Sequence, residues 1–245
     1  MKGILDYKLD ENQSHQLRLL MEIDTICNEY GINYCLGYGT LLGAFRHEGF
    51  IPWDADIDIT MTEEDYDKFA AACKKELDES VRVLCDSRNY RGYPKVYGRY
   101  YDISCCRLSD KVNFWDDVCG KGVDIFYQID VPAGEEQGEE FIDYYYAYDE
   151  YANGTYRHYR MKPDRVMKFY NEAKELEKLY GMEKTLQAME ARIFGQHFDN
   201  VVYRMDVSAR YHDLNPIIKK NTMNIRRGCF LKDICCRYPV IIWRS

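Results

Sequence analysis

The chain has 245 residues, of which 46% are hydrophobic and 30% charged, as in an ordinary soluble globular protein. Its net charge of −8 disfavours a nucleic-acid backbone as a partner. The N-terminal residues place charges within their only short apolar run, and no stretch approaches the ~20 apolar residues of a membrane span. We therefore expect no secretion signal, no transmembrane segment and a cytoplasmic location.

In chain order, the first 133 residues are expected to contain helices at 11–30 and 62–77 and a helical turn at 40–46. Strands are expected at 32–38, 54–61, 81–85, 96–108 and 123–131. Gly31 follows the first helix in the position of a C-terminal stop. Thr62, with three acidic residues behind it, caps the second long helix.

From residue 134 to about 203 the chain is rich in Tyr, Glu and Lys and mainly helical in pattern. This order predicts an α/β (α+β) fold, with a mixed sheet, flanking helices and a C-terminal helical region. We assign residues 1–133 to the core, 134–214 to a helical extension and 215–245 to an atypical basic tail. The tail holds seven basic residues and one acidic residue, a balance of +6, which leaves −14 for the rest.

The ten cysteines include no C-x-x-C pair, and Cys105–Cys106 and Cys235–Cys236 are adjacent. This spacing is not that of a zinc motif, and no secretion signal points to disulfides. Reduced, mostly buried thiols are the expected state.

The most informative stretch carries aspartates at every second position, Asp54, Asp56 and Asp58. In a strand, residues two apart point to the same face, so these carboxylates would repel one another unless a cation lies among them. Dense oxygen ligands suit Mg²⁺ (or Mn²⁺), which takes its remaining positions from water and substrate phosphates.

Other interpretations of this stretch compete with a metal site. A merely solvated edge strand stays open. An EF-hand loop starting at Asp54 fails, because its sixth position is Ile59 rather than Gly and its twelfth is Asp65 rather than Glu. The glycine cluster upstream is one residue too long for a dinucleotide-binding loop.

The turn at Gly39 and Thr40 suits a phosphate beside this metal site. A glycine lets backbone N–H groups approach an anion closely, and the helical turn that follows directs its N-terminus at it. Arg46 and His47 are candidates for further positive charge on the phosphates, with a surface ion pair to Glu48 as the alternative.

The segment from Gly39 to Asp58, GTLLGAFRHEGFIPWDADID, closely resembles the hallmark of the LicD family, which includes bacterial phosphocholine transferases. The fukutin-related glycan phosphotransferases carry a looser version. The family has a nucleotidyltransferase fold, in which a Gly-Ser/Thr turn precedes an Asp-x-Asp strand and a later strand supplies a third carboxylate. Gly39–Thr40 matches the turn, and Asp56 and Asp58 match the paired metal ligands.

Val123-Asp-Ile-Phe126 resembles the family's later strand, which implies Asp124 as the third metal ligand. Asp130, on the same predicted strand, is the alternative. Ala55 departs from the family pattern, since many members have Asp there; its parity directs it away from the metal.

The resemblance implies Mg²⁺-dependent transfer of a phospho-alcohol group, such as phosphocholine, from a CDP-activated donor to a hydroxyl of a glycan or glycolipid acceptor, in the synthesis of cell-surface polysaccharide, teichoic acid or lipopolysaccharide. Asp56 and Asp58 would hold the metal against the diphosphate, and Asp54 or Asp124 would accept the proton of the attacking hydroxyl.

Basic and aromatic residues on the later predicted strands are further candidates for the substrate site. Lys95, Arg99 and Arg107 are candidates for diphosphate contacts. Three tyrosines are candidates for stacking a base or an alcohol group, with core packing as the alternative, namely Tyr97, Tyr100 and Tyr101.

Two other functions are alternatives. One is transfer of a whole nucleotide to a small molecule, which would release pyrophosphate rather than CMP. The other is a catalytically impaired protein that retains the fold as a binding module.

The basic tail lacks the Phe-Glu-Gly, Pro-x-Pro and Asp-Tyr elements with which LicD-family chains usually continue. Back-translation read from the third base of each codon permits all three of them between Arg227 and Ser245. We interpret the chain from a point between about 205 and 222 onward as a frameshifted tail, with a natural basic tail as the alternative. The nucleotide sequence decides between them, because a stop codon in the third-base frame would exclude the frameshift.

Overall fold

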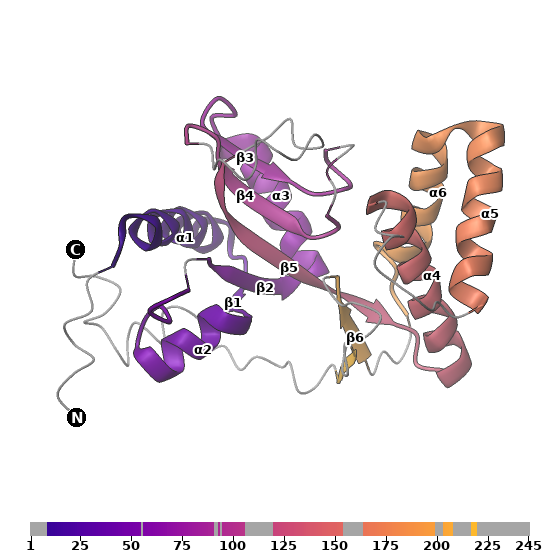
Figure 1. Ribbon diagram of the computed structural model, residues 1–245, viewed down its shortest axis with the longest axis horizontal. Coiled ribbons are helices and arrows are strands. Elements are labelled where there is room, and N and C mark those ends of the chain that lie inside the picture. The colour runs from indigo at the N-terminus through magenta and orange to yellow at the C-terminus, as the bar shows by residue number, and fades with distance from the viewer. Residues whose placement is uncertain are drawn as a thin grey trace. The chain divides into compact units, whose positions relative to one another are not determined.

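The computed structural model describes residues 9–54, 56–90, 93, 95–105, 120–153, 164–198, 203–207 and 217–219. They form two compact units, the first from the described residues of 9–85 and 98–127, the second from those of 86–97 and 128–219. Figure 1 shows the elements of both. The expected mixed α/β architecture is confirmed.

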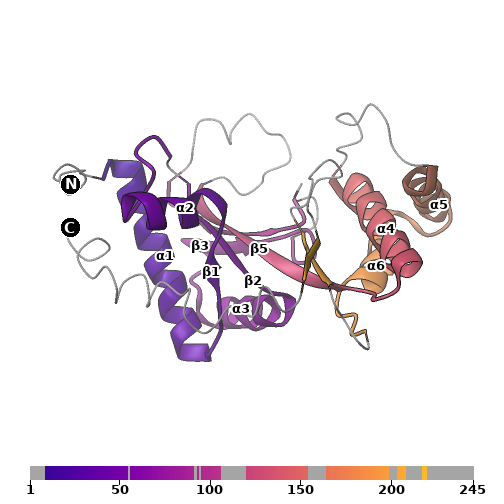
Figure 2. The same cartoon turned by 90° about the horizontal axis from the view of Figure 1, so that it is seen from below.

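The first unit contains, in chain order, α1 (Glu11–Tyr30), β1 (Cys35–Leu36), α2 (Tyr38–His47), β2 (Asp58–Thr62), α3 (Glu63–Glu76), β3 (Arg82–Cys85), β4 (Gly98–Asp102) and the first half of β5 (Lys121–Val131). The strands follow the order β1-β2-β5-β4-β3. α1 packs against α3, α3 contacts β2 and β3, and α2 contacts β2 (Figure 2).

The predicted first helix is confirmed from end to end. Asp10 and Gln13 form a capping box at its N-terminus, in which each side chain accepts from the other's backbone N–H. Gly31 ends the helix in a left-handed conformation, with φ 65°. The buried face of α1 includes Leu20 and Ile23, so its apolar stripe supports the core that carries the sheet.

The acidic strand is shorter than predicted. β2 begins only at Asp58, so Asp54 and Asp56 lie in the preceding loop, and this part of the prediction is wrong. The reason lies in the partner strand. β1 ends at Leu36, Gly37 donates its N–H to the carbonyl of Asp58 (2.8 Å), and the chain then turns into α2. β1 therefore has no residue left to pair with the segment before Asp58.

β4 also ends earlier than expected. The side chain of Asp102 accepts from the backbone N–H of Ser104 (2.9 Å), and this local turn competes with the strand. The rest of the predicted strand, residues 106–108, lies outside the described residues.

Tyrosine stacking closes the core between α3 and the sheet. The rings of Tyr66 and Tyr127 are stacked with centroids 4.3 Å apart, and both are fully buried. Gly98 makes room for them, since a Cβ there would lie 2.3 Å from the Tyr66 hydroxyl. The absence of a side chain at Gly98 in β4 thus allows the Tyr66 ring of α3 to pack closely against the sheet.

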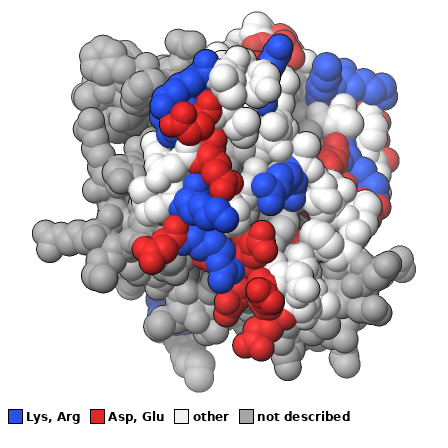
Figure 3. Space-filling model, turned by 90° about the vertical axis from the view of Figure 1, so that its right-hand side faces the viewer, with Lys and Arg blue, Asp and Glu red and all other residues white. Residues whose placement is uncertain are grey.

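The second unit contains α4 (Glu135–Asn153), α5 (Asp164–Tyr180), α6 (Met182–Ile193), β6 (Tyr203–Asp206), β7 (Ile217–Lys219) and the second half of β5. The three helices pack on one another, as the helical pattern predicted. Tyrosines of α4 fill their interface; the Tyr148 hydroxyl, for example, bonds to Ser87 and Glu190. Lys and Arg are interspersed with Asp and Glu on the face that Figure 3 shows.

Two predictions concern the end of the chain, which the structure describes only in part. The helical pattern was expected to reach about residue 203, but α6 ends at Ile193 and β6 follows, paired with β5. Within the basic tail, β7 pairs with β6, and residues 220–245 lie outside the described residues. Across the described parts of the chain, no helix combines the length and apolar character that crossing a bilayer requires.

Candidate active site

The turn from β1 into α2 fixes the backbone at the start of β2. The N–H of Asp58 donates to the Thr40 hydroxyl (2.9 Å), while the carbonyl of Asp58 accepts from Gly37 (2.8 Å). Tyr38, between them, has a positive φ of 42°, which costs a non-glycine residue about 1–3 kcal/mol. The first turn of α2 is thus held next to the start of β2, and the N-terminus of a helix is an arrangement that favours anions.

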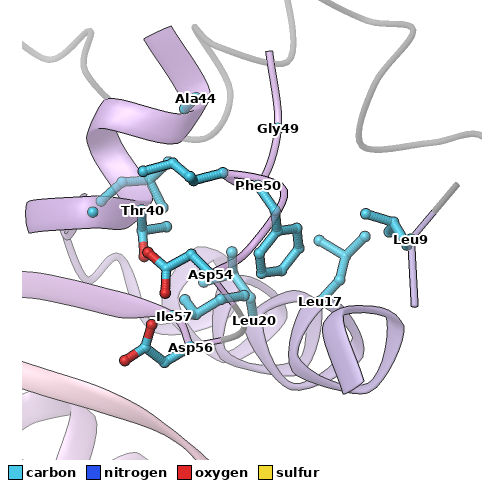
Figure 4. A pocket seen from close by; sticks show the side chains of 13 residues that line it. Leu9, Leu17, Leu20, Thr40, Ala44, Gly49, Phe50, Asp54, Asp56 and Ile57 are labelled. Carbon is cyan, nitrogen blue, oxygen red and sulfur yellow. The ribbon is translucent and has the colours of Figure 1, made fainter. Parts of the chain in front are cut away.

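Asp54 is held against the same turn. Its carbonyl accepts from the Gln13 side chain (2.8 Å) and its N–H donates to the carbonyl of Ile51 (2.9 Å). A Cβ on Gly39 would lie 2.8 Å from the Asp54 carboxylate oxygen Oδ2, so the absence of a side chain at Gly39 lets this carboxylate approach. Figure 4 shows the Asp54 carboxylate directed toward Thr40.

The electrostatics of Asp58 reveal how densely acidic this region is. The pKa of Asp58 is raised to about 7, first by burial and then by the charges of Asp124, Asp56 and Asp54, in that order, against a lowering by Arg99. All three other candidate carboxylates therefore act on this one group. A carboxyl group whose pKa is shifted by burial and by several like charges is typical of a functional site.

Asp124 reaches the cluster from β5. Its backbone N–H donates to the carbonyl of Ile57 (3.0 Å), one residue before Asp58. The alternative, Asp130, lies in the second unit and is ion-paired with Arg204 (2.8 Å). The structure thus brings Asp124, and not Asp130, next to Asp58.

Arg99 contacts Asp124 rather than standing free for a phosphate. Arg99 Nε lies 3.0 Å from Asp124 Oδ1, which is an ion pair, although the N–H is not aligned for a hydrogen bond. The two residues face each other across β4 and β5. Arg99 can therefore hold the Asp124 carboxylate in place and offset part of the negative charge.

The donor set of the cluster fits Mg²⁺ in chemistry, since it consists of carboxylate oxygens. A divalent cation would also offset the mutual repulsion that raises the pKa of Asp58. Among the described residues, the group whose ligand atoms all lie within 4.8 Å of one another is a different one, formed by His15, Asp102 and Cys105, and it too is compatible with a divalent metal. Cysteine and histidine spacing gave no sign of this second group.

Among the other predicted substrate-binding residues, Arg46 and His47 lie away from the start of α2. Arg46 and His47 lie in the last turn of α2, at the opposite end from Thr40, where Arg46 Nε donates to His47 Nε2 (2.9 Å). Lys95 belongs to the second unit, with its ammonium over the Tyr97 ring. Arg107 lies outside the described residues.

Two of the tyrosines considered for stacking belong to the core. Tyr100 and Tyr101 are 1% and 3% exposed, and the Tyr100 hydroxyl donates to Glu22 (3.1 Å). The alternative given for them, core packing, is what the structure shows.

A pocket with a cavity volume of about 70 Å³, partly open to solvent, adjoins the cluster. Asp54 and Asp56 line it together with Gly39 and Thr40 (Figure 4). The rest of its wall is mostly apolar and includes Leu17, Leu20, Leu36, Phe50, Ile51 and Ile57. The pocket thus combines an apolar wall with carboxylates, within the first unit.

Comparison with known proteins identifies the relatives of this chain. The sequence model described as LicD/FKTN/FKRP, nucleotidyltransferase domain, matches residues 31–173. The lipopolysaccharide cholinephosphotransferase LicD of Haemophilus influenzae is 45% identical over 75 residues, 31% of this chain and 28% of that protein. Uncharacterised proteins of Rickettsia typhi and Rickettsia prowazekii are 38% and 42% identical over 60 and 86 residues, which cover 24% and 35% of this chain. The matches span 19–28% of the length of these relatives.

Replacing Asp58 with Asn should stabilise the metal-free protein. Because the folded state raises the pKa of Asp58 from 3.8 to about 7, it binds this proton more tightly than the unfolded chain does, and stability is lost as the pH rises through that window. We expect Asp58→Asn to increase the free energy of unfolding at pH 8 by about 1–3 kcal/mol, and by less at pH 4. Urea unfolding with a chelator present measures both.

The control for this variant is Asp130→Asn, which removes a carboxylate that is ion-paired with Arg204 and should therefore destabilise the protein. A lower stability of Asp58→Asn than of wild type at pH 8 would contradict the repulsion described for the cluster.

Proposed function

Because the chain belongs to the LicD/FKTN/FKRP nucleotidyltransferase-domain family, whose model matches more than half of it, we propose that it transfers a phosphocholine group from CDP-choline to a glycan hydroxyl. The cholinephosphotransferase name of the Haemophilus influenzae relative supports choline as the alcohol and a lipopolysaccharide-type glycolipid as the acceptor. The observation that carries the proposal is that the charges of Asp54, Asp56 and Asp124 all act on Asp58, whose backbone is held by Gly37 and Thr40 at the start of α2.

In the proposed reaction, the acceptor hydroxyl oxygen attacks the phosphorus that bears choline, and the bond from that phosphorus to the CMP oxygen breaks. Asp56, Asp58 and Asp124 would hold Mg²⁺, which when bound offsets the charge of the diphosphate and of the leaving CMP. The N–H groups at Gly39 and Thr40 would bind a phosphate oxygen.

Asp54 is the proposed acceptor of the hydroxyl proton. Its carboxylate lies against Gly39 and lines the pocket, whereas Asp124 is engaged with Arg99. Asp54 thus combines access to the pocket with a position beside the phosphate-binding turn, which is the geometry that a general base needs.

The pocket supports choline among the CDP-activated alcohols. A trimethylammonium group has an apolar surface and no N–H to donate, so it prefers an aromatic or aliphatic wall with negative charge nearby. Phe50, Leu17 and Leu20 offer such a wall, and Asp54 and Asp56 offer the charge (Figure 4).

Replacing Asp56 with Ala should abolish the reaction without unfolding the protein, because this side chain is exposed and lies in a loop. We expect kcat to fall at least about 100-fold, since charge stabilisation is the main contribution to phosphoryl transfer. Release of CMP from CDP-choline with Mg²⁺ and a glycan acceptor measures it. Asp67→Ala, an exposed aspartate of α3, should keep wild-type activity.

The products of the same assay separate the alternatives. CMP together with a phosphocholine-bearing glycan supports the proposal. Pyrophosphate with a nucleotidylated acceptor would overturn it in favour of nucleotide transfer, and no turnover with any activated donor would favour a binding module.

Gly39→Ala should slow the reaction while sparing the fold. Alanine is a better helix former than glycine, but its Cβ would collide with the Asp54 carboxylate at 2.8 Å. We expect kcat to fall at least about tenfold with little change in Tm, because a displaced base loses its alignment. At Gly37 a Cβ would meet Asp58 at an ordinary 3.6 Å, so Gly37→Ala is the matched control; equal losses in both variants would argue against a role for Asp54.

Phe50→Ala should impair use of CDP-choline selectively. Loss of the aromatic wall is expected to raise KM for CDP-choline about tenfold, while KM for CDP-glycerol changes little. Because both donors are measured on one protein, a folding defect would affect them alike. A parallel change in both KM values would place the choline group elsewhere.

A further inference from the structure

We propose that His15, Asp102 and Cys105 form a zinc-binding site in the first unit, distinct from the acidic cluster. His15 lies near the start of α1, Asp102 ends β4, and Cys105 lies in the turn that follows. Their ligand atoms all lie within 4.8 Å of one another. This inference does not rest on the proposed transferase activity.

The distances suit a tetrahedral metal. His15 Nε2 lies 3.1 Å from Asp102 Oδ2 and 3.6 Å from Cys105 Sγ. A tetrahedral zinc ion with ordinary bond lengths separates N and O ligands by ~3.4 Å and N and S ligands by ~3.6 Å. Two of the three distances between ligand atoms thus match a zinc tetrahedron, and the third, between Asp102 and Cys105, is within 4.8 Å. The fourth corner is left for water or another ligand.

The surroundings of Asp102 support it as a ligand through one oxygen. Its side chain is buried. Its Oδ1 forms an ion pair with Arg82 (2.9 Å) and accepts hydrogen bonds from the backbone N–H and the hydroxyl of Ser104. Oδ2 faces His15. Such outer hydrogen bonds orient a carboxylate so that its second oxygen is presented in one direction.

The protonation and charge of the site also suit Zn²⁺. Burial lowers the pKa of His15 below its ordinary value, as do the charges of Lys121, Arg18 and Arg82, against the raising effect of Asp102. The imidazole is then neutral near pH 7, as a metal ligand must be. A carboxylate and a thiolate would neutralise Zn²⁺, which offsets the cost of placing it near these three cations.

The competing interpretation is a plain hydrogen-bond network. In it, His15 Nε2–H donates to Asp102, and His15 Nδ1 accepts from Arg18 Nη2 (3.2 Å). Zinc on Nε2 would move the ring proton to Nδ1, so the exposed Arg18 would have to turn away, and the Cys105 thiol would lose its proton to solvent. The two interpretations therefore differ in proton release and in thiolate–metal bonding, both of which can be measured.

The site is separate from the carboxylate cluster along β4. Asp102 is three residues from Arg99, or about 10 Å along the strand, and it is Arg99 that pairs with Asp124. A zinc ion here, with ligands His15 and Asp102 that are 87 positions apart in the sequence, would join α1 to the end of β4 and would act as a structural link.

The test uses the full chain with excess Mg²⁺, which occupies oxygen-rich sites. Zinc should bind once per chain, raise Tm by at least about 5 °C and release about one proton per ion at pH 7. Cobalt as a replacement should give a thiolate-to-metal charge-transfer band. The proposal is overturned if no zinc binds in the presence of excess Mg²⁺, or if the cobalt complex lacks the thiolate-to-metal charge-transfer band.

Variants identify the ligands. Cys105→Ser and His15→Gln should each weaken zinc binding at least about 100-fold, while their metal-free Tm stays close to that of the metal-free wild type. Cys106→Ser is the matched control, an adjacent cysteine whose loss should leave zinc affinity unchanged. Undiminished affinity in Cys105→Ser, or an equal loss in Cys106→Ser, overturns the assignment, whatever the outcome of the transferase assays.

Discussion

The candidate active site depends on how the backbone of Asp58 is held. In the turn between β1 and α2, the Thr40 hydroxyl accepts a hydrogen bond from the N–H of Asp58. The N–H of Gly37 donates to the carbonyl of Asp58. These two bonds place the first turn of a helix beside the first residue of an acidic strand. The N-terminal end of α2, where the helix dipole favours negative charge, and the carboxylates, which favour positive charge, are thereby fixed next to each other.

The region stores unfavourable energy at two places. Asp58 is half-buried among like charges, and Tyr38 has a positive φ of 42°. Neither feature helps the protein fold. The surrounding structure compensates through the capped helix α1, the stacked Tyr66 and Tyr127, and the packed sheet. Unfavourable features that are concentrated in one region of a well-packed structure are typical of a functional site.

The family match and the compact units divide the chain differently. The matched residues, 31–173, include α2, β2 and the whole of β5 but not α1, and they extend through α4 into α5. α1 nevertheless contributes to the candidate site, because Gln13 holds the Asp54 carbonyl and Leu17 lines the pocket. The candidate site thus draws on residues outside the matched range.

Much of this fold could be predicted from local sequence. The first helix, with Asp10 and Gly31 at its ends, and the cap at Thr62 follow from short-range rules, because the groups that satisfy a helix end lie within a few residues of it. The alternation of exposed and buried residues from Asp56 to Ile59 was also readable, and so was the resemblance that singled out Asp124.

Other features depend on residues that are distant in sequence and meet only in the folded chain. β2 starts at Asp58 rather than Asp54 because a strand extends only as far as its partner, and β1 ends at Leu36. Arg99 faces Asp124 because of the register of β4 and β5. His15, Asp102 and Cys105 come together because α1 packs beside the end of β4, and no spacing rule connects a histidine to a cysteine 90 residues away. Short-range patterns determine where elements begin and what they carry; pairing and packing decide which side chains meet.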